Sequence, residues 1–170
     1  SQRIISADSG AGRIKVDSGY NDSRSRQVLL VDGYNMIFAW DELKDMAESS
    51  LENARKMLIE ILANYQGYYG TEIIIVFDAY KQPGNAGTTE KYGDLSVIYT
   101  REGQTADQYI EKFVLENVKK LHLTVATSDG LEQLMVFGQG ALRMPARELR
   151  ERIIAANQEI REKYIGKPIT

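Results

Sequence analysis

Four aspartates in this chain lie at or just past the ends of short apolar runs, in a pattern that can bind a divalent metal ion. They are Asp32, Asp78, Asp107 and Asp129. If the runs are parallel strands of one sheet, the aspartates meet at the edge formed by the carboxyl ends of the strands. Carboxylates gathered in this way repel one another and raise at least one pKa unless a cation neutralises them. We therefore expect a cation among these four side chains.

The chemistry of such a site is well defined. Carboxylate oxygens favour Mg²⁺ and Mn²⁺, hard cations that keep several waters and engage substrate phosphates. One or two such ions can activate water and stabilise the leaving oxygen in phosphodiester cleavage. Any single aspartate after a strand can instead cap a helix or start a turn. The only histidine, His122, begins an apolar run and is expected to be a packed or edge residue, and cysteine is absent. Both facts argue against a histidine-based triad or a thiolate zinc site.

The runs that precede the aspartates have the composition of buried strands. They cover residues 27–31, 72–77, 95–100 and 122–127. Continuous apolar runs of four to eight residues are typical of strands that helices cover on both faces. The sequence therefore predicts a parallel sheet rather than an exposed antiparallel one.

Two segments between these runs have helical periodicity. Residues 50–66 and residues 105–121 place apolar side chains at three- and four-residue spacing. Ser49 and Glu52 form a capping-box pattern at the first helix, and Thr105 is the expected N-cap of the second. Strands that alternate with helices predict right-handed crossovers in one parallel sheet, and hence an α/β fold.

The chain divides into one main domain and two short terminal segments. Residues 1–26 are rich in Ser, Gly, Asp and Arg and are expected to be a tail or linker, residues 27–165 form the domain, and residues 166–170 are a C-terminal tail. The irregular stretch from 80 to 94 contains three glycines and a proline. We expect it to be either a mobile substrate flap or a tolerated surface insertion.

Charge and hydrophobicity limit the possible partners. The net charge of −3 and the pI near 5.3 are unusual for a free-standing nucleic-acid binder, so any such binding must be local or assisted. No apolar run approaches the roughly 18 to 20 residues of a membrane span, and the amino terminus has no signal-peptide region. We expect a soluble, cytoplasmic protein without a membrane partner.

Three residues beside the aspartates have both a functional and a structural interpretation. Asn35 either orients a metal-bound water or a substrate phosphate, or serves as a turn residue. Ser128 is a natural N-cap for a helix that begins at Asp129. Glu132 lies one helical turn after Asp129 and either joins the acidic site or faces solvent.

Five motifs follow one another along the chain. They are LLVDGYNMI at 29–37, VFDAY at 76–80, YTREGQTAD at 99–107, ATSDGLEQ at 126–133 and GQGALRMPAREL at 138–149. In this order they resemble the YacP-like branch of the NYN domains, which belong to the PIN-like superfamily of metal-dependent nucleases. The resemblance spans about residues 27 to 154, and five linked motifs make it far more specific than any one of them.

The resemblance implies a three-layer αβα Rossmann-like (PIN-like) fold, with a mostly parallel sheet of four or five strands, and Mg²⁺- or Mn²⁺-dependent endonucleolytic cleavage of RNA. Matched position by position, the candidate catalytic residues are Asp32, Asn35, Asp78, Asp107 and Asp129. We expect Asp32, Asp107 and Asp129 to hold one or two metal ions, and Asp78 to complete the acidic shell directly or through water. Gln104 stands where family members often have Glu, which puts a fifth carboxylate in doubt.

Side chains near these motifs are candidates for local contact with RNA. Those expected to bind RNA are Lys81, Lys91, Arg101, Arg143 and Tyr34, with Tyr80 and Tyr92 as further aromatic rings for base stacking. Each of these tyrosines can equally pack in the core or on the surface.

The family also suggests partners. In its best-understood members the substrate is messenger RNA on the translating ribosome, so RNA and the ribosome are the expected partners. Some members are fused behind translation GTPases of the ribosomal-protection type, and residues 19–22 look like the junction of such a fusion. Two alternatives remain open, namely a non-catalytic RNA- or ribosome-binding module and a metal-dependent phosphatase that acts on small molecules.

Overall fold

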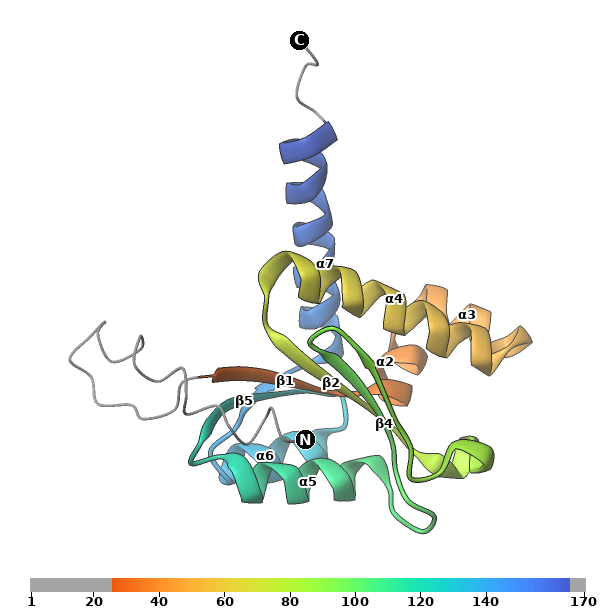
Figure 1. Cartoon of the computed structure of the whole chain (residues 1–170), viewed down its shortest axis with the longest axis vertical. Helices are drawn as coiled ribbons and strands as arrows, with labels where there is room; N and C mark the ends of the chain where they lie inside the picture. The colour runs from red at the N-terminus through yellow and green to blue at the C-terminus, as the bar shows by residue number, and fades with distance from the viewer. Residues whose placement is uncertain (1–25, 166–170) are drawn as a thin grey trace, which may run out of the picture.

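The structure, a computed structural model, describes residues 26–165 and consists of a central sheet between two helical layers (Figure 1). The elements in chain order are β1 (Arg26–Asp32), α2 (Gly33–Ala39), α3 (Asp41–Ser49), α4 (Leu51–Tyr69), β2 (Glu72–Phe77), η2 (Ala79–Lys81), η3 (Pro83–Asn85), β3 (Thr89–Tyr92), β4 (Leu95–Tyr99), α5 (Ala106–Asn117), β5 (Leu121–Ala126), α6 (Gly130–Gly138), β6 (Leu142–Met144), α7 (Ala146–Ile160) and η4 (Arg161–Ile165). The tails expected at 1–26 and 166–170 lie outside the described residues, apart from Arg26, which begins β1.

The sheet has the strand order β3-β4-β2-β1-β5-β6. All neighbouring strands pair in parallel except β3 and β4, which form an antiparallel hairpin. In the register of the sheet, Asp32 pairs with Val76 of β2, and Val31 pairs with Ala126 of β5. The carboxyl ends of β1, β2 and β5 therefore lie at the same edge, as the sequence predicts.

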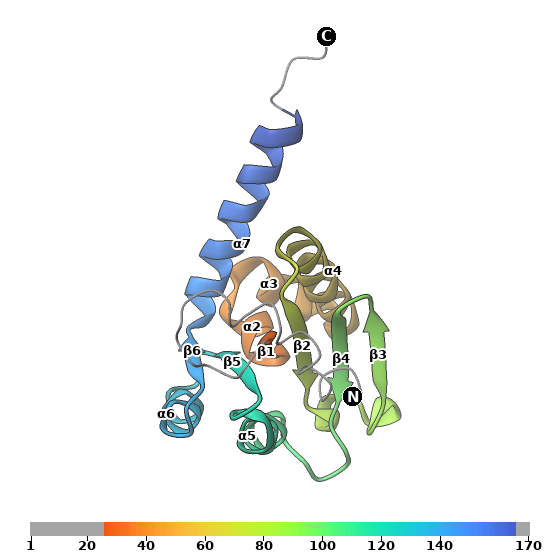
Figure 2. The ribbon, with the colours of Figure 1, turned by 60° about the vertical axis from the view of Figure 1, so that its left-hand side comes forward.

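Both faces of the sheet are covered by helices (Figure 2). Alternate residues of β1 point to opposite faces, so Leu29 and Val31 pack with α2, α3, α4 and α7, whereas Val28 and Leu30 pack with α5 and α6. This arrangement confirms the predicted three-layer α/β fold and explains why the central strands have continuous apolar sequences.

Two strands were not expected, which makes six in the described residues rather than four or five. They are the edge strands β3 and β6, and both are short and mostly exposed. An exposed edge strand needs no apolar run, so its sequence resembles that of a loop. β3 lies within the stretch predicted to be an irregular loop, which the structure resolves into two 3₁₀ turns and one arm of a hairpin.

The helix cap predicted from the sequence is confirmed at α5 and differs at α4. Thr105 caps α5 in a full capping box with Gln108, as predicted. The cap of α4 is Ser50 rather than Ser49, because its side chain accepts from the backbone N–H of Asn53 while Ser49 still belongs to α3. The prediction was wrong by one residue because the capping-box pattern favours Ser49, which has Glu52 three residues later, whereas the actual cap, Ser50, bonds to the backbone of Asn53 and needs no glutamate.

Close packing fixes the beginning of α2 against the sheet. A Cβ atom on Gly33 would lie 2.4 Å from the ring of Phe77, so only glycine allows this approach of the helix to β2. At the end of α2, the indole N–H of Trp40 donates to the carbonyl of Ala146 at 3.0 Å and links this helix to α7. The residues that follow Asp32 are thus held between the sheet and α7.

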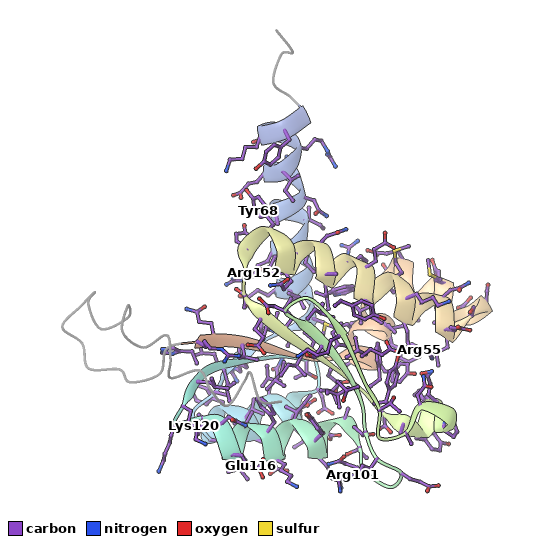
Figure 3. The ribbon with its side chains drawn as sticks, in the orientation of Figure 1. Arg55, Tyr68, Arg101, Glu116, Lys120 and Arg152 are labelled. Carbon is purple, nitrogen blue, oxygen red and sulfur yellow. The ribbon has the colours of Figure 1, made fainter. Side chains whose placement is uncertain are left out.

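The far end of α7 extends away from the body of the domain (Figures 1 and 2). Tyr68, near the end of α4, lies beside α7, and Arg152 is a residue of α7 (Figure 3). The hydroxyls of Tyr68 and Tyr69 donate to Glu159 at 3.1 and 3.4 Å. None of the helices within residues 26–165 is long and apolar enough to cross a membrane.

Candidate metal-binding site

The centre of the acidic edge, where the carboxyl ends of the strands meet, is a pair of carboxyl groups. They belong to Asp32, in the first of the five sequence motifs, and to Glu132, in the fourth. Asp32 ends β1 and caps α2, where one of its oxygens accepts from the backbone N–H of Asn35 at 3.4 Å. Glu132 lies in the first turn of α6 and is only 2% exposed. The two side chains lie within hydrogen-bonding range of each other.

Neither carboxylate oxygen of Glu132 accepts a hydrogen bond of good geometry within residues 26–165, although the hydroxyl of Thr127 lies near enough to lower the pKa of this carboxyl group. Two ionised carboxylates offer only acceptors, so their contact requires a shared proton or a cation. A buried polar group without a partner costs about 1 to 3 kcal/mol, and more when it is charged. The Asp32–Glu132 pair is therefore complete only with a proton or a positive ion.

The pKa values of both carboxyl groups are raised, which agrees with this requirement for a proton or a cation. Burial raises the pKa of Asp32 to about 6, and the negative charges of Asp107 and Asp129 act in the same direction. Burial together with the charge of Asp32 raises the pKa of Glu132 to about 9. Both shifts favour the protonated form in the absence of a cation, and a bound cation would reverse them.

Asp107 and Asp129 lie close enough to influence this pair. Asp107 is in the first turn of α5, and its charge raises the pKa of both Asp32 and Glu132. Asp129 caps α6, where one oxygen accepts from the backbone N–H groups of Leu131 and Glu132 at 3.0 and 3.3 Å. Within residues 26–165, however, no three acidic or histidine side chains lie close enough together to enclose a metal ion as they stand. The predicted convergence is thus seen as one pair with two nearby charges.

Asp78 lies toward the other side of the edge. It follows β2 and caps η2, where one of its oxygens accepts from the backbone N–H of Tyr80 at 3.1 Å. Its charge contributes to the raised pKa of Tyr34, whose largest cause is burial. The described interactions of the Asp78 side chain are thus with these two tyrosines and not with the Asp32–Glu132 pair.

Asn35 holds the segments of the site together. Its side-chain oxygen accepts from the backbone N–H of Ser128 at 2.6 Å, and the hydroxyl oxygen of Ser128 accepts from the backbone N–H of Ala146 at 3.1 Å. Asn35 therefore joins the start of α2 to the turn before α6, and Ser128 joins that turn to α7. The expectation that Ser128 caps α6 was wrong, because Asp129 takes that role and leaves Ser128 to α7.

Among the RNA-binding candidates, Tyr34 requires a correction. Its side chain is only 6% exposed, its ring packs 4.9 Å from that of Phe77, and its hydroxyl accepts from the guanidinium of Arg55 at 3.1 Å. A buried ring cannot stack on an RNA base, so Tyr34 is a core residue. The Asp-Gly-Tyr-Asn motif alone does not show whether the tyrosine is buried or available for RNA. Its burial depends on α4, which carries Arg55.

Lys81 has a defined place beside the site. Its ammonium lies 5.8 Å from the ring centres of Tyr34 and Tyr80 and 5.9 Å from that of Phe38. Cation–π contacts of this kind fix the position of a charge that would otherwise move on a flexible side chain. Lys81 is thus held at the surface, near the end of β2.

The other basic candidates are spread over the sheet. Lys91 is on β3 and Arg143 on β6, the strands at opposite edges, so they do not form one basic surface. Arg143 stacks over Phe137 with its guanidinium 5.2 Å from the ring centre. Edge strands were not predicted, so their distance from each other could not be seen in the sequence.

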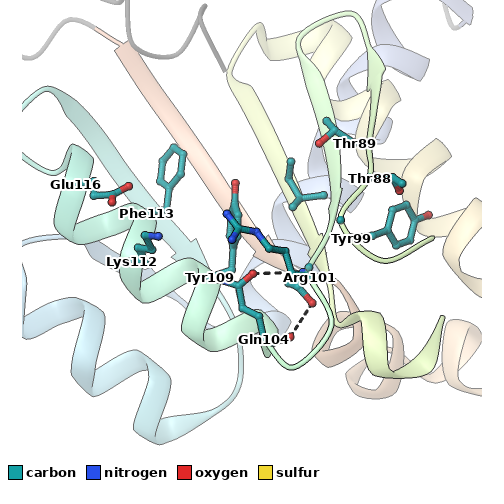
Figure 4. Close-up of a pocket in the computed structure, with 12 residues that line it drawn as sticks. Thr88, Thr89, Tyr99, Arg101, Gln104, Tyr109, Lys112, Phe113 and Glu116 are labelled. Atoms are coloured by element: carbon teal, nitrogen blue, oxygen red, sulfur yellow. Dashed lines mark hydrogen bonds between the residues drawn. The ribbon is translucent and has the colours of Figure 1, made fainter. Parts of the chain in front are cut away.

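Arg101 lines a separate cavity of about 250 Å³, between the loop after β4 and α5 (Figure 4). Lys112 of α5 lines the same cavity, a basic residue that the sequence motifs do not indicate. The backbone N–H of Arg101 donates to the side-chain oxygen of Gln104 at 3.4 Å. Gln104 thus closes the turn after β4, at the position where a further carboxylate was in doubt.

Glu132 is the residue whose importance the sequence left undecided. Its spacing from Asp129 places both in the first turn of α6, which is compatible with a metal site and with a solvated helix face. The structure excludes the solvated alternative, because Glu132 is buried against Asp32. A glutamate within a short helix rich in Leu, Met and Phe is the signal in the sequence that could have indicated this.

Comparison with known proteins identifies the relatives of this chain. Residues 29–168 match the model of the YacP-like NYN domain, a nuclease-like, RNA-related domain. The YacP protein of Bacillus subtilis (strain 168) is 46% identical over 135 residues, which are 78% of each chain.

Two crystal structures of Rae1 (YacP) from Bacillus subtilis have the same fold. A single-substitution mutant matches with a TM-score of 0.70 and 43% identity over 85% of this chain and 86% of that one. A second structure matches with a TM-score of 0.67 and 42% identity over 80% and 78%. These matches are of single-domain size and do not support the expected fusion to a translation GTPase. The chain belongs to the YacP-like NYN domain family.

Proposed function

We propose that this protein is an endoribonuclease that depends on Mg²⁺ or Mn²⁺. The observation that carries the proposal is the Asp32–Glu132 pair, in which a buried carboxylate that accepts no hydrogen bond of good geometry within residues 26–165 lies against a second carboxylate. All-oxygen sites of this kind favour hard divalent cations. The family supplies the substrate class, since NYN domains are related to RNA.

The residues present are suited to hold such an ion. Asp32 and Glu132 would provide the nearest oxygens, and Asp107 and the second oxygen of Asp129 would approach from the starts of α5 and α6. When bound, the ion would act as a Lewis acid that makes water a better nucleophile and neutralises charge on the phosphate.

The remaining residues have supporting roles. Asn35 fixes the turn that carries Asp129, through its bond to Ser128. Asp78, at the end of β2, would complete the acidic edge on the side of Tyr80, directly or through water. Hydrolysis by this arrangement is expected to leave 5′-phosphate and 3′-hydroxyl ends. We further propose that the cytoplasmic ribosome presents the messenger RNA, which would compensate for the acidic net charge.

A direct test measures metal binding and RNA cleavage in the same preparations. The wild type should take up Mn²⁺ or Mg²⁺ in a calorimetric titration and cut a labelled single-stranded RNA, and EDTA should abolish the cutting. Glu132→Gln should weaken metal binding by at least about 10- to 100-fold. Glu116→Gln, an exposed glutamate on α5, is the matched control and should behave as the wild type.

Cleavage that persists in EDTA, or equal metal affinity in Glu132→Gln and the wild type, would contradict the proposal. Comparison of free and ribosome-bound messenger RNA as substrates tests the role of the ribosome. If only the ribosome-bound form is cut, the ribosome is required.

The second candidate is a non-catalytic RNA- or ribosome-binding module. It is favoured by the absence, within residues 26–165, of three carboxylates already grouped around one point. Such a module would bind RNA but would not cut it with any divalent ion. The same cleavage assay with Mg²⁺, Mn²⁺ and Ca²⁺ separates the two candidates.

A further inference from the structure

A second cavity, of about 530 Å³, lies next to the acidic edge. The two 3₁₀ turns after β2 form one wall, and the loop that leads into α5 forms the other, both at the lower right of Figure 1. Its volume is within the range of roughly 300 to 1,000 Å³ that is typical of small-molecule sites. Asp78 follows β2 at the acidic edge and also lines the cavity, so the cavity adjoins that edge.

The walls of this cavity differ in chemistry. Ala79, Tyr80, Pro83 and Ala86 make one side apolar. Asp78 and Glu102 contribute carboxyl groups, and Gln104 and Thr105 contribute further polar groups. Two carboxylates disfavour an anion inside the cavity, whereas a flat neutral group with polar edges suits both walls. A nucleobase has this combination.

Tyr80 is the most exposed large apolar side chain of the described residues, at 84%. The structure fixes its backbone, because its N–H donates to Asp78 at 3.1 Å within the turn. An aromatic ring so exposed on a fixed turn presents a face on which a base can stack. Tyr34 is buried, so the stacking role expected from the sequence falls to Tyr80.

Lys81 provides the charge that accompanies a base. Its ammonium is held by the rings of Tyr34, Phe38 and Tyr80, outside the carboxylate-lined cavity. A base stacked on Tyr80 carries its phosphate along the backbone, and a cation fixed 5.8 Å from the centre of that ring is within reach of it. A neutral base in the cavity and a phosphate beside the Lys81 ammonium together correspond to one nucleotide of a single strand.

We propose that this cavity binds one base of single-stranded RNA, with Tyr80 stacking on the base and Lys81 contacting the adjacent phosphate. The inference rests on the proposed function, since it gives the substrate a second point of attachment beside the scissile phosphate. Stacking is tolerant of sequence, because every base has an aromatic face. The site therefore selects an unpaired strand rather than a particular sequence.

The test measures RNA binding by the full 170-residue chain in EDTA, where cleavage is absent. The probe is a single-stranded oligoribonucleotide that contains the fluorescent base 2-aminopurine. Tyr80→Ala should weaken binding by roughly 5- to 150-fold and remove the fluorescence quenching that stacking causes. Tyr80→Phe should retain both. Tyr164→Ala replaces an exposed tyrosine at the remote end of the chain and should leave both unchanged.

Lys81→Gln provides an independent measurement. Loss of one phosphate contact should reduce the slope of log affinity against log salt by about 1. Equal affinity and equal quenching in Tyr80→Ala and the wild type would overturn the inference, and so would a wild type that does not bind the probe. Tyr80-dependent binding of oligolysine without binding of RNA would also overturn it, since the occupant would then be a cationic peptide.

The results also separate this inference from the proposed function. If the wild type binds RNA through Tyr80 but never cuts it with any metal, the nuclease proposal fails and the binding site stands. If the wild type cuts RNA with metal and Tyr80→Ala has the same KM and affinity, the binding site fails and the nuclease proposal stands.

Discussion

The two sides of the sheet edge differ in burial and in charge. On the β1–α6 side, Asp32 and Glu132 are packed together, and Glu132 accepts no hydrogen bond of good geometry from the described residues. On the β2–β4 side, Tyr80 is exposed and Lys81 is supported by aromatic rings. The first side concentrates negative charge in a buried pair, and the second side presents an exposed aromatic ring beside a fixed cation. The contrast suggests that chemistry and substrate binding are divided between them.

Removal of an acid on the first side should give the largest effect. Asp32→Asn should reduce metal-dependent RNA cleavage by at least about 10³-fold, because it removes a charge from the pair that would hold the ion. RNA affinity in EDTA should remain within about twofold of the wild type. Asparagine can still cap α2, so the circular dichroism spectrum should not change.

Asp107→Asn is the companion variant on α5, and it should also abolish cleavage with the fold retained. If either variant cut RNA as fast as the wild type in matched metal, that residue would have no place in the site. If RNA affinity fell together with cleavage, the two sides would not be separate.

The pH dependence of stability tests the acid pair without any substrate. In the folded protein the pKa of Asp32 is raised to about 6 and that of Glu132 to about 9, so the folded state binds protons more tightly than the unfolded state. The stabilisation by these protons is complete below about pH 4 and is lost as the pH rises toward 9. Glu132→Gln removes one of the two groups. At pH 8, the free energy of unfolding of metal-free Glu132→Gln should therefore be about 1 to 3 kcal/mol higher than that of the wild type, so the variant should be more stable.

The measurement is urea unfolding at pH 4.5 and pH 8, with EDTA present. The difference between variant and wild type should be much smaller at the lower pH, because both carboxyl groups are then protonated in the folded state and the pH is close to the pKa of about 4.3 that Glu132 has in the unfolded state. A difference that is the same at both pH values would indicate that packing, and not proton binding, is responsible.

The smallest effect is expected on the second side, at Thr105. This residue lines the cavity and caps α5 through its hydroxyl oxygen, which accepts from the backbone N–H of Gln108 at 3.2 Å. Thr105→Ala should lower the free energy of unfolding by about 1 kcal/mol, while Thr105→Ser should retain the cap. Thermal unfolding of the three proteins measures this. Equal loss in both variants would show that the methyl group, and not the cap, stabilises the helix.

The sequence predicted the parts of the fold that burial dictates. The central strands have apolar runs because helices cover both faces, and Thr105 caps α5 because a capping box is local. β3 and β6 were not predicted, since exposed edge strands need no apolar residues. For the candidate site, too, the sequence predicted the local features and missed those that depend on distant elements. The positions of the aspartates after strands are local facts, whereas the burial of Tyr34 and Glu132 depends on helices that are distant in sequence.

The contact between Gly33 and Phe77 has a consequence for protein engineering and for sequence divergence. Replacement of helical glycines by alanine is a common route to thermostable variants, and Gly67 in α4, with open space around its Cβ position, is suitable for it. Gly33 is not, because its added methyl group would overlap the aromatic ring. Positions 33 and 77 can therefore change only together, and a homologue with a larger residue at the first should carry a smaller one at the second.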